Sequence, residues 1–251
     1  MKKYIVLALL IMIALSGLVY YKTDDRSMDK LLLILSQGKG VNEVSRLFQK
    51  GFDVNTIDKK GITPLMYASI INPNPDILQL LIEKGADVNA EVNGITTLMF
   101  AAIADIEPDV IEMLVRKGAD INARNKDGIT TLMFAILNNS KPDMITALIK
   151  NGADINVGYK ESVLVVSSSN NNNLDIIDTQ DNNDVNNSTI VTHGLTPLML
   201  AARYSPNPEI LRIMLENGAD VSLKSSEGKN ALDYADENER IKGTEEYKLL
   251  R

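Results

Sequence analysis

The sequence predicts an all-α solenoid built from repeated helix–turn–helix units, because two short motifs recur with one shared spacing. The first motif reads GADVN, GADIN, GADIN and GADVS, starting at Gly85, Gly118, Gly152 and Gly218, with a looser GFDVN at Gly51. The second reads GITPLM, GITTLM, GITTLM and GLTPLM, starting at Gly61, Gly94, Gly128 and Gly194, with a degenerate GKNALDYA at Gly228. Successive copies lie 33 or 34 residues apart, or 66, which is twice 33. Such a period is typical of stacked helix pairs that share a continuous core.

The second motif predicts the start of a short first helix. A threonine stands two residues after the glycine, and proline follows it at Thr63 and at Thr196. Threonine is a favourable N-cap, and proline suits the first helical position, where its missing N–H would have no partner within the helix. The largely apolar run Leu65–Ala68 then predicts a short helix with little polar surface.

A longer second helix completes each unit. It is predicted to begin where proline precedes an acid, a pair that suits the positive end of the helix dipole. The copies are Pro75-Asp76, Pro108-Asp109, Pro142-Asp143 and Pro208-Glu209. The apolar residues Ile77, Leu78, Leu81 and Ile82 lie on one side at helical spacing. The glycine of the first motif then ends the helix in a left-handed cap, and Asn93-Gly94 and Asp127-Gly128 predict tight turns.

These motifs resemble the ankyrin repeat. The resemblance rests on the 33-residue period, the Gly-x-Thr-Pro-Leu opening and the Gly-Ala-Asp-Val-Asn close, and it covers most of the chain from about Ser27 onward. It implies a stack of about six to seven units, one of them degenerate, and the apolar N-terminal segment is expected to precede this stack as a helix. Ankyrin repeats usually carry His after Thr-Pro-Leu, where it hydrogen-bonds helix and turn together. Because methionine stands there in four copies, we expect apolar packing to replace those bonds and the turns to be looser; these are Met66, Met99, Met133 and Met199.

The repeat boundaries divide the chain into segments. Residues 1–21 are predicted to be a signal peptide or membrane anchor, and residues 22–56 a degenerate N-terminal repeat. Four ankyrin-like repeats are predicted, at residues 57–90, 91–123, 124–156 and 193–223. Residues 157–192 are predicted to be an Asn-rich loop or eroded repeat, and residues 224–251 a C-terminal capping repeat. A terminal repeat needs a polar outer face, and Asp236–Arg240 supplies one.

The doubled spacing falls on the Asn-rich segment. Its runs Ser167–Asn173 and Asp181–Asn187 are typical of a disordered insertion. However, Ser162–Ile177 aligns without a gap to Thr63–Leu78, with Leu, Ser, two Asn, Asp and Ile at equivalent positions. The segment is therefore either a simple insertion or an eroded repeat whose first helix still stacks.

The N-terminus indicates export. The start MKK precedes eighteen uncharged residues, Tyr4–Tyr21, and a basic start before an apolar run is typical of an export signal. Cleavage after Ala14-Leu15-Ser16 would release the repeats into the periplasm or the medium. Retention would anchor them in the membrane on its non-cytoplasmic side, since eighteen residues is near the lower limit for a span.

Composition and motifs argue against catalysis and nucleic-acid binding. The chain has 33 acidic and 26 basic residues, a net charge of -7, and no basic cluster. It has no cysteine, and its one histidine, His193, is interpreted as a turn residue. Asp87, Asp120, Asp154 and Asp220 recur with the repeat, which indicates turn hydrogen bonds, and Asp181–Asp184 lacks the Gly and Glu of a calcium loop. We expect no enzyme activity, no cofactor and no metal site.

The resemblance implies a protein-binding scaffold. We expect it to be a monomer outside the cytoplasm, with membrane contact only through residues 4–21 and only if that segment is not cleaved. Its partner would meet the turn tips and the exposed side of the first helices. The candidate residues just after each turn glycine are Ile62, Ile95, Ile129 and Leu195; those near the ends of the first helices are Ile71, Ala104, Asn138 and Tyr204. The aliphatic tips either form an apolar binding ridge or pack against neighbouring turns. A dedicated immunity or effector-type module that binds one secreted enzyme or target protein is the alternative function.

Overall fold

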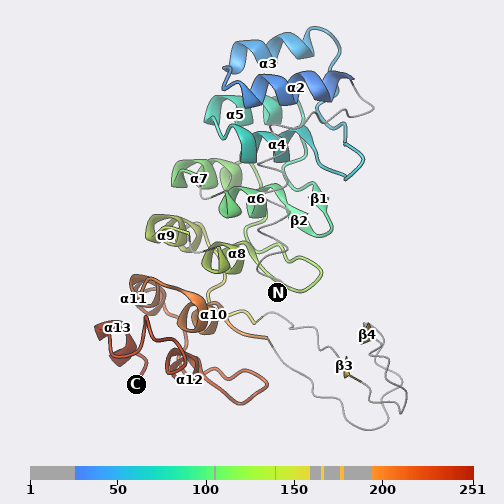
Figure 1. Ribbon diagram of the computed structural model, residues 1–251. Coiled ribbons are helices and arrows are strands. Elements are labelled where there is room, and N and C mark those ends of the chain that lie inside the picture. The colour runs from blue at the N-terminus through green and yellow to red at the C-terminus, as the bar shows by residue number, and fades with distance from the viewer. Residues whose placement is uncertain (1–25, 105, 139, 159–164, 167–175, 178–193) are drawn as a thin grey trace. The chain divides into compact units, whose positions relative to one another are not determined.

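The computed structural model describes residues 26–104, 106–138, 140–158, 165–166, 176–177 and 194–251 (Figure 1). The chain forms two compact units. One comprises Met1–Lys126 with Thr130–Asp154, and the other comprises Asp127–Ile129 with Ile155–Arg251. Within the described residues no helix is both long and apolar enough to cross a membrane. The predicted signal or anchor lies outside them and stays a prediction.

Pairs of helices make up both units. In the N-terminal unit they are α2 (Arg26–Ser36) and α3 (Val41–Phe48), α4 (Pro64–Ile71) and α5 (Pro75–Glu83), α6 (Thr97–Ile103) and α7 (Pro108–Arg116), and α8 (Thr131–Leu137) and α9 (Pro142–Lys150). In the C-terminal unit they are α10 (Pro197–Tyr204) and α11 (Glu209–Glu216), and α12 (Ala231–Ala235) and α13 (Glu245–Lys248). The mainly helical chain is an all-α repeat fold, as the sequence predicts.

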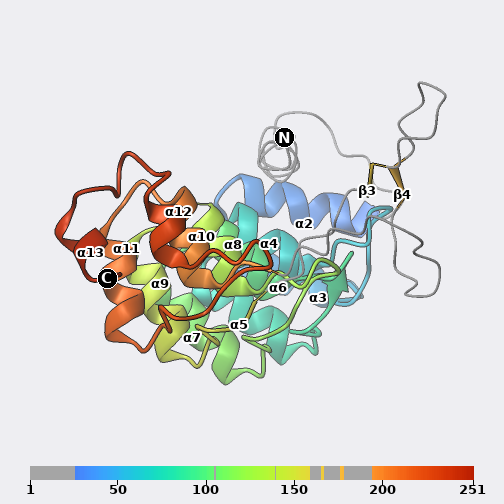
Figure 2. The same ribbon diagram turned by 90° about the horizontal axis from the view of Figure 1, so that it is seen from below.

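The N-terminal unit is a stack in which like helices meet. Its first helices contact one another in the order α2, α4, α6, α8, and among the second helices α3 contacts α5 and α7 contacts α9. Figure 1 shows the two resulting columns within this unit, and Figure 2 shows α5, α7 and α9 on one side of α4, α6 and α8. One helix pair cannot bury its apolar face alone, so stacking supplies the core. In the C-terminal unit, α10 contacts both α11 and α12, and α11 contacts α13.

The local start and stop signals act as predicted. The Thr63 hydroxyl accepts a hydrogen bond from the Met66 N–H at 3.3 Å, and the same cap recurs in α6, α8 and α10. Proline is the first residue of α5, α7 and α9, whereas α11 is assigned from Glu209, one residue after its proline. Gly85 ends α5 with a φ of 92°, in the left-handed region where a side chain would be strained.

The core is largely aliphatic, and the recurring methionines belong to it. All four are at most 1% exposed: Met66, Met99, Met133 and Met199. Two hydroxyls beside them, of Thr97 and Thr131, are buried and make no hydrogen bond. These threonines stand at the first helical position, where α4 and α10 have proline.

Tyrosine hydroxyls, as well as apolar packing, connect helix and turn in two repeats. The Tyr67 hydroxyl donates to the Asp58 carboxylate at 2.6 Å, and the Tyr234 hydroxyl and Ser225 Oγ lie 2.9 Å apart. The expectation that apolar packing replaces the missing histidine bonds is therefore incomplete at the Met66 repeat, where Tyr67 adds a hydrogen bond; the Tyr234 repeat has Asp233 in place of methionine and was not part of that expectation. The signal was present in the sequence, since tyrosine follows the third helical position in GITPLMYA and GKNALDYA.

Two short strands are described in the Asn-rich segment. β3 (Val165–Val166) pairs antiparallel with β4 (Ile176–Ile177). The eroded-repeat reading expected a stacked first helix over Ser162–Val166. Most of that range lies outside the described residues, and its two described residues are strand and not helix.

Candidate interaction surface

The turn tips are not a uniformly exposed ridge. Ile62 is 4% exposed and Leu195 is 1% exposed, whereas Ile95 and Ile129 are half-buried. At Ile62 and Leu195, burial favours the alternative in which the tips pack against neighbouring turns over an exposed apolar ridge. The Ile62 backbone explains its orientation, because its N–H donates to Asp58 Oδ1 at 2.8 Å and its carbonyl accepts from the Asp58 N–H at 3.1 Å.

The second turn is a tight hairpin. β1 (Glu91–Val92) and β2 (Ile95–Thr96) pair antiparallel, with Val92 opposite Ile95. Asn93 and Gly94 between them have φ of 54° and 76°, which confirms the predicted Asn-Gly turn. A side chain at Gly94 would come within 2.9 Å of the Asn125 backbone, so the next turn packs closely against this one.

The residues at the ends of the first helices differ in exposure. Ile71, Ala104 and Asn138 are half-buried, whereas Tyr204 is 39% exposed. The Asn138 side-chain amide donates to the Ile103 carbonyl in the preceding repeat at 2.6 Å. This gives Asn138 a structural role, so Tyr204 is the most accessible of the eight candidates.

A ladder of asparagines connects successive repeats, and sequence reasoning assigned it no role. Asn89 Nδ2 donates to the Gly118 carbonyl at 2.8 Å, and its Oδ1 accepts from the Asp120 N–H at 2.8 Å. The same pair of bonds is made by Asn55, Asn122 and Asn156. Its sequence signal was the last residue of GADVN, which recurs with the repeat. Asp87 and Asp120 accept from the N–H two residues on, which confirms the predicted turn bonds.

The ladder passes over the Asn-rich segment. Asn89 and Gly118 are 29 residues apart, but Asn156 donates to the Gly218 carbonyl 62 residues further along the chain. A side chain added at Gly158 would lie 3.2 Å from the Gly194 carbonyl oxygen, so the two flanks of the segment come together. Among the described residues, the ladder therefore continues directly from Asn156 to Gly218 and Asp220.

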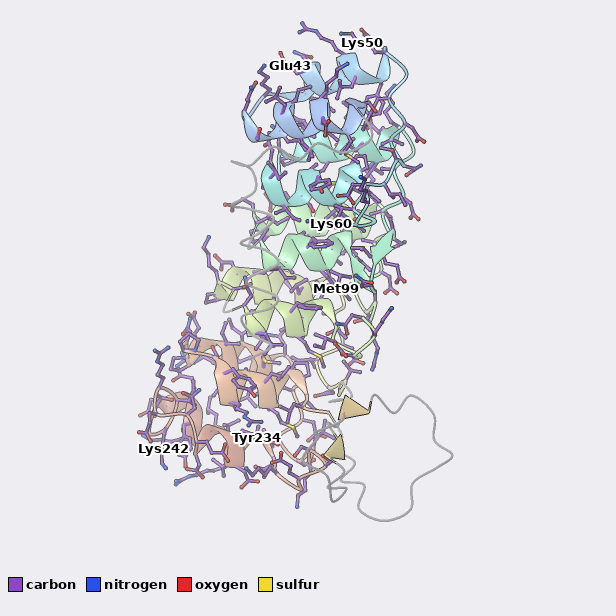
Figure 3. All side chains as sticks on the ribbon, turned by 45° about the vertical axis from the view of Figure 1, so that its right-hand side comes forward. Glu43, Lys50, Lys60, Met99, Tyr234 and Lys242 are labelled. Atoms are coloured by element: carbon purple, nitrogen blue, oxygen red, sulfur yellow. The ribbon has the colours of Figure 1, made fainter. Side chains whose placement is uncertain are left out.

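A cluster of rings and charges lies on α10 and α12. Tyr234, labelled in Figure 3, has the guanidinium of Arg203 5.3 Å from its ring centre and the ammonium of Lys229 at 5.4 Å. Arg203 also lies 5.2 Å from the ring of Tyr204. Cations placed over aromatic faces are attracted by the ring quadrupole. The Arg203 guanidinium thereby lies within cation–π distance of two rings.

Lys229 pairs with acids of the same unit. Its Nζ donates to Glu237 Oε1 at 2.6 Å and lies 3.5 Å from Glu227. The bond with Glu237 raises the pKa of Lys229 and lowers the pKa of Glu237, because each charge stabilises the other. Glu237 is thus ionised and already engaged near neutral pH.

The described residues contain no group of three or more His, Asp or Glu side chains that could hold a metal ion. His193, interpreted as a turn residue, lies outside the described residues.

Stacked helix pairs connected by recurring asparagines define a helical repeat protein. Proteins of this class form extended surfaces to which several repeats contribute. Family models described as ankyrin repeats in three copies match residues 12–92, 31–125, 74–159 and 98–179, and one described as ankyrin repeats in many copies matches 181–235. The chain belongs to the ankyrin repeat family.

Two curated relatives share one short region with the chain. It is 41% identical over 69 residues to the mitochondrial disaggregase of Bos taurus and 39% identical over 69 residues to that of Homo sapiens. The match covers 28% of this chain and 10% of each relative, so the chain spans about a tenth of their length. Ankyrin repeats are generally non-catalytic and typical of protein–protein interaction scaffolds.

Proposed function

We propose that the chain is a non-catalytic scaffold that binds a partner protein through the turn tips and first helices of its ankyrin stack. The stack itself carries the proposal. In the N-terminal unit, α2, α4, α6 and α8 contact one another in order and so place equivalent residues of successive repeats side by side. Such surfaces suit extended partners, because each repeat adds contact area without changing the fold.

Accessible residues on this side favour one region for partner contact. Tyr204 is 39% exposed at the end of α10, next to Arg203. Tyrosine and arginine are enriched among the residues that dominate binding energy at protein interfaces. We therefore place the strongest partner contact at this end of α10.

The N-terminal segment supports a location outside the cytoplasm. Tyr4–Tyr21 has no charge and follows two lysines, as expected for an export signal or a membrane anchor. Protease added to cells whose outer envelope is opened but whose cytoplasmic membrane is intact should degrade a C-terminal epitope tag, whereas protection of the tag until the cytoplasmic membrane is opened would contradict this location. Carbonate extraction then separates a retained anchor from a released, cleaved domain.

Affinity capture with matched variants tests the binding function. We expect the full chain to capture a partner that Tyr204→Glu no longer captures. Leu249→Glu is the control, because Leu249 is also an exposed apolar residue, at 55%, but follows the last helix. Capture that is unaffected by Tyr204→Glu, or abolished equally by both variants, would contradict the proposed surface. A single dominant partner would favour the dedicated-partner alternative over a general scaffold.

A further inference from the structure

We propose that Arg203 is a recognition residue for a carboxylate on an acidic segment of the partner protein. This inference rests on the proposed scaffold function and names the chemistry of the partner. It depends on three observations: a departure from the repeat pattern, the placement of the guanidinium, and its lack of an acceptor.

Arg203 departs from the repeat. The equivalent positions in α4, α6 and α8 are aliphatic: Ile70, Ile103 and Leu137. No charged residue occurs in those three helices, so Arg203 is the one charged residue among the four first helices that carry the Leu-Met motif. Positions that recur are explained by packing and inter-repeat bonds, whereas a charge in place of a buried or half-buried aliphatic residue needs a separate explanation.

Two rings hold the guanidinium in place. Its centre lies 5.2 Å from the Tyr204 ring and 5.3 Å from the Tyr234 ring, and Tyr234 is fully buried. Arg203 itself is half-buried. Stacking on rings restricts the rotamers of the side chain, and a group that is already ordered loses less entropy when it binds.

Its hydrogen-bonding groups are unused. A guanidinium has five N–H donors in a planar fork, yet within the part of the chain that the structure describes Arg203 makes no hydrogen bond or ion pair. The carboxylate whose pKa responds to Arg203 is Glu237, and Glu237 already accepts from Lys229 at 2.6 Å. The donors of Arg203 therefore have no acceptor among the described residues and stay available to a ligand.

The charges around the site favour a carboxylate over a phosphate. A carboxylate matches the fork with two parallel hydrogen bonds. Lys229 and Arg203 contribute two positive charges, and Glu227, Glu237 and Asp233, which also acts on Glu237, contribute three negative ones, so this group carries a net charge of -1. A phosphate, with about -1.5 to -2 charge near neutral pH, would meet more repulsion from the two glutamates than a singly charged carboxylate.

The arginine Nε–Hε signals of the full chain provide a direct test at constant ionic strength. The probe is a blocked Gly-Glu-Gly tripeptide, with Gly-Gln-Gly as its uncharged counterpart. We expect a saturable shift at Arg203 with the Glu probe and at least about fivefold weaker binding of the Gln probe, because charge-assisted bidentate bonds are the stronger ones. The signal of Arg240, an exposed arginine of the same unit, is the internal control and should shift little.

Three results would overturn the proposal: no saturable shift at Arg203, equal responses of Arg203 and Arg240, or tighter binding of inorganic phosphate than of the Glu probe. Arg203→Lys keeps the charge but loses the fork, so it should weaken Glu-probe binding while the melting curve stays near that of the parent chain. Glu237→Gln should strengthen binding, because it removes a competing negative charge. Partner capture that depends on Tyr204 but not on Arg203 would refute this inference and leave the scaffold function standing.

Discussion

The first helices of the two units contrast in the residues that they place at their C-terminal ends. In the N-terminal unit, α4, α6 and α8 are uncharged, and their last residues are buried or half-buried. In the C-terminal unit, α10 ends in Arg203 and the exposed Tyr204. Residues that recur in every repeat are engaged in core packing and in hydrogen bonds to the next repeat. Partner recognition is therefore expected at residues that depart from the repeat pattern. Substitutions can separate the recurring, structural residues from these departures.

The largest loss of stability is expected at a recurring core position. Met99, labelled in Figure 3, is fully buried in α6, and Met99→Ala should lower the free energy of unfolding by about 2–5 kcal/mol, because it removes contacts and leaves a cavity. Urea unfolding followed by circular dichroism measures this change. Met99→Leu conserves volume and should cost less than about 1.5 kcal/mol. If both variants lose the same free energy of unfolding, the loss does not come mainly from the cavity, because only the alanine variant creates a large one.

The asparagine ladder should account for the next largest loss. Asn89→Ala removes two inter-repeat bonds of 2.8 Å, and we expect about 1–2 kcal/mol of destabilisation, moderated because water reaches the exposed partners. Asn42→Ala is the control, since Asn42 is exposed on α3 and makes no inter-repeat bond to any residue that the structure describes. If both variants unfold at the same urea concentration, the ladder is not a source of stability.

A gain of stability is expected where a repeat carries threonine in place of proline. Thr97→Pro removes a buried hydroxyl without a partner and fixes φ at the first helical position, so it should raise the free energy of unfolding by about 1 kcal/mol. The preceding residue, Thr96, has φ of -86° and ψ of 167°, which a following proline accepts.

Thr131→Pro should give a similar increase, and the two should nearly add. Thermal melts of the single and double variants measure the effect. A lower melting temperature for Thr97→Pro would mean that the hydroxyl has a role in the folded chain.

The smallest change in stability is expected at Tyr67, whose hydroxyl adds a hydrogen bond to one turn. Tyr67→Phe removes the 2.6 Å bond to Asp58 and should cost about 1 kcal/mol. Phe100→Tyr is the matched reverse change, and it should add no stability, because the turn before α6 has Glu91 in place of the aspartate. Hydrogen exchange of the Ile62 N–H, which the same carboxylate accepts, reports on the turn directly. Unchanged exchange in Tyr67→Phe would argue that the hydroxyl does not hold the turn.

Much of the fold could be predicted because its signals are local. The Thr63 cap, the Pro75 start and the Gly85 stop each depend on neighbours within one helical turn, and each is present. The candidate surface was predicted less well. Burial of Ile62 and Leu195 depends on side chains outside the motif, and the motif alone gives their position but not their exposure.

The sequence by itself determined the repeat family, the order of the helices and the residues that start and end them, because a period of 33 residues encodes one supersecondary unit at a time. Tertiary structure decided which residues meet. Asn156 bonds to Gly218 across 62 residues, and Arg203 on α10 reaches the ring of Tyr234 on α12. These contacts join different repeats. A motif that is the same in every repeat does not specify which repeats will make a contact that the others lack.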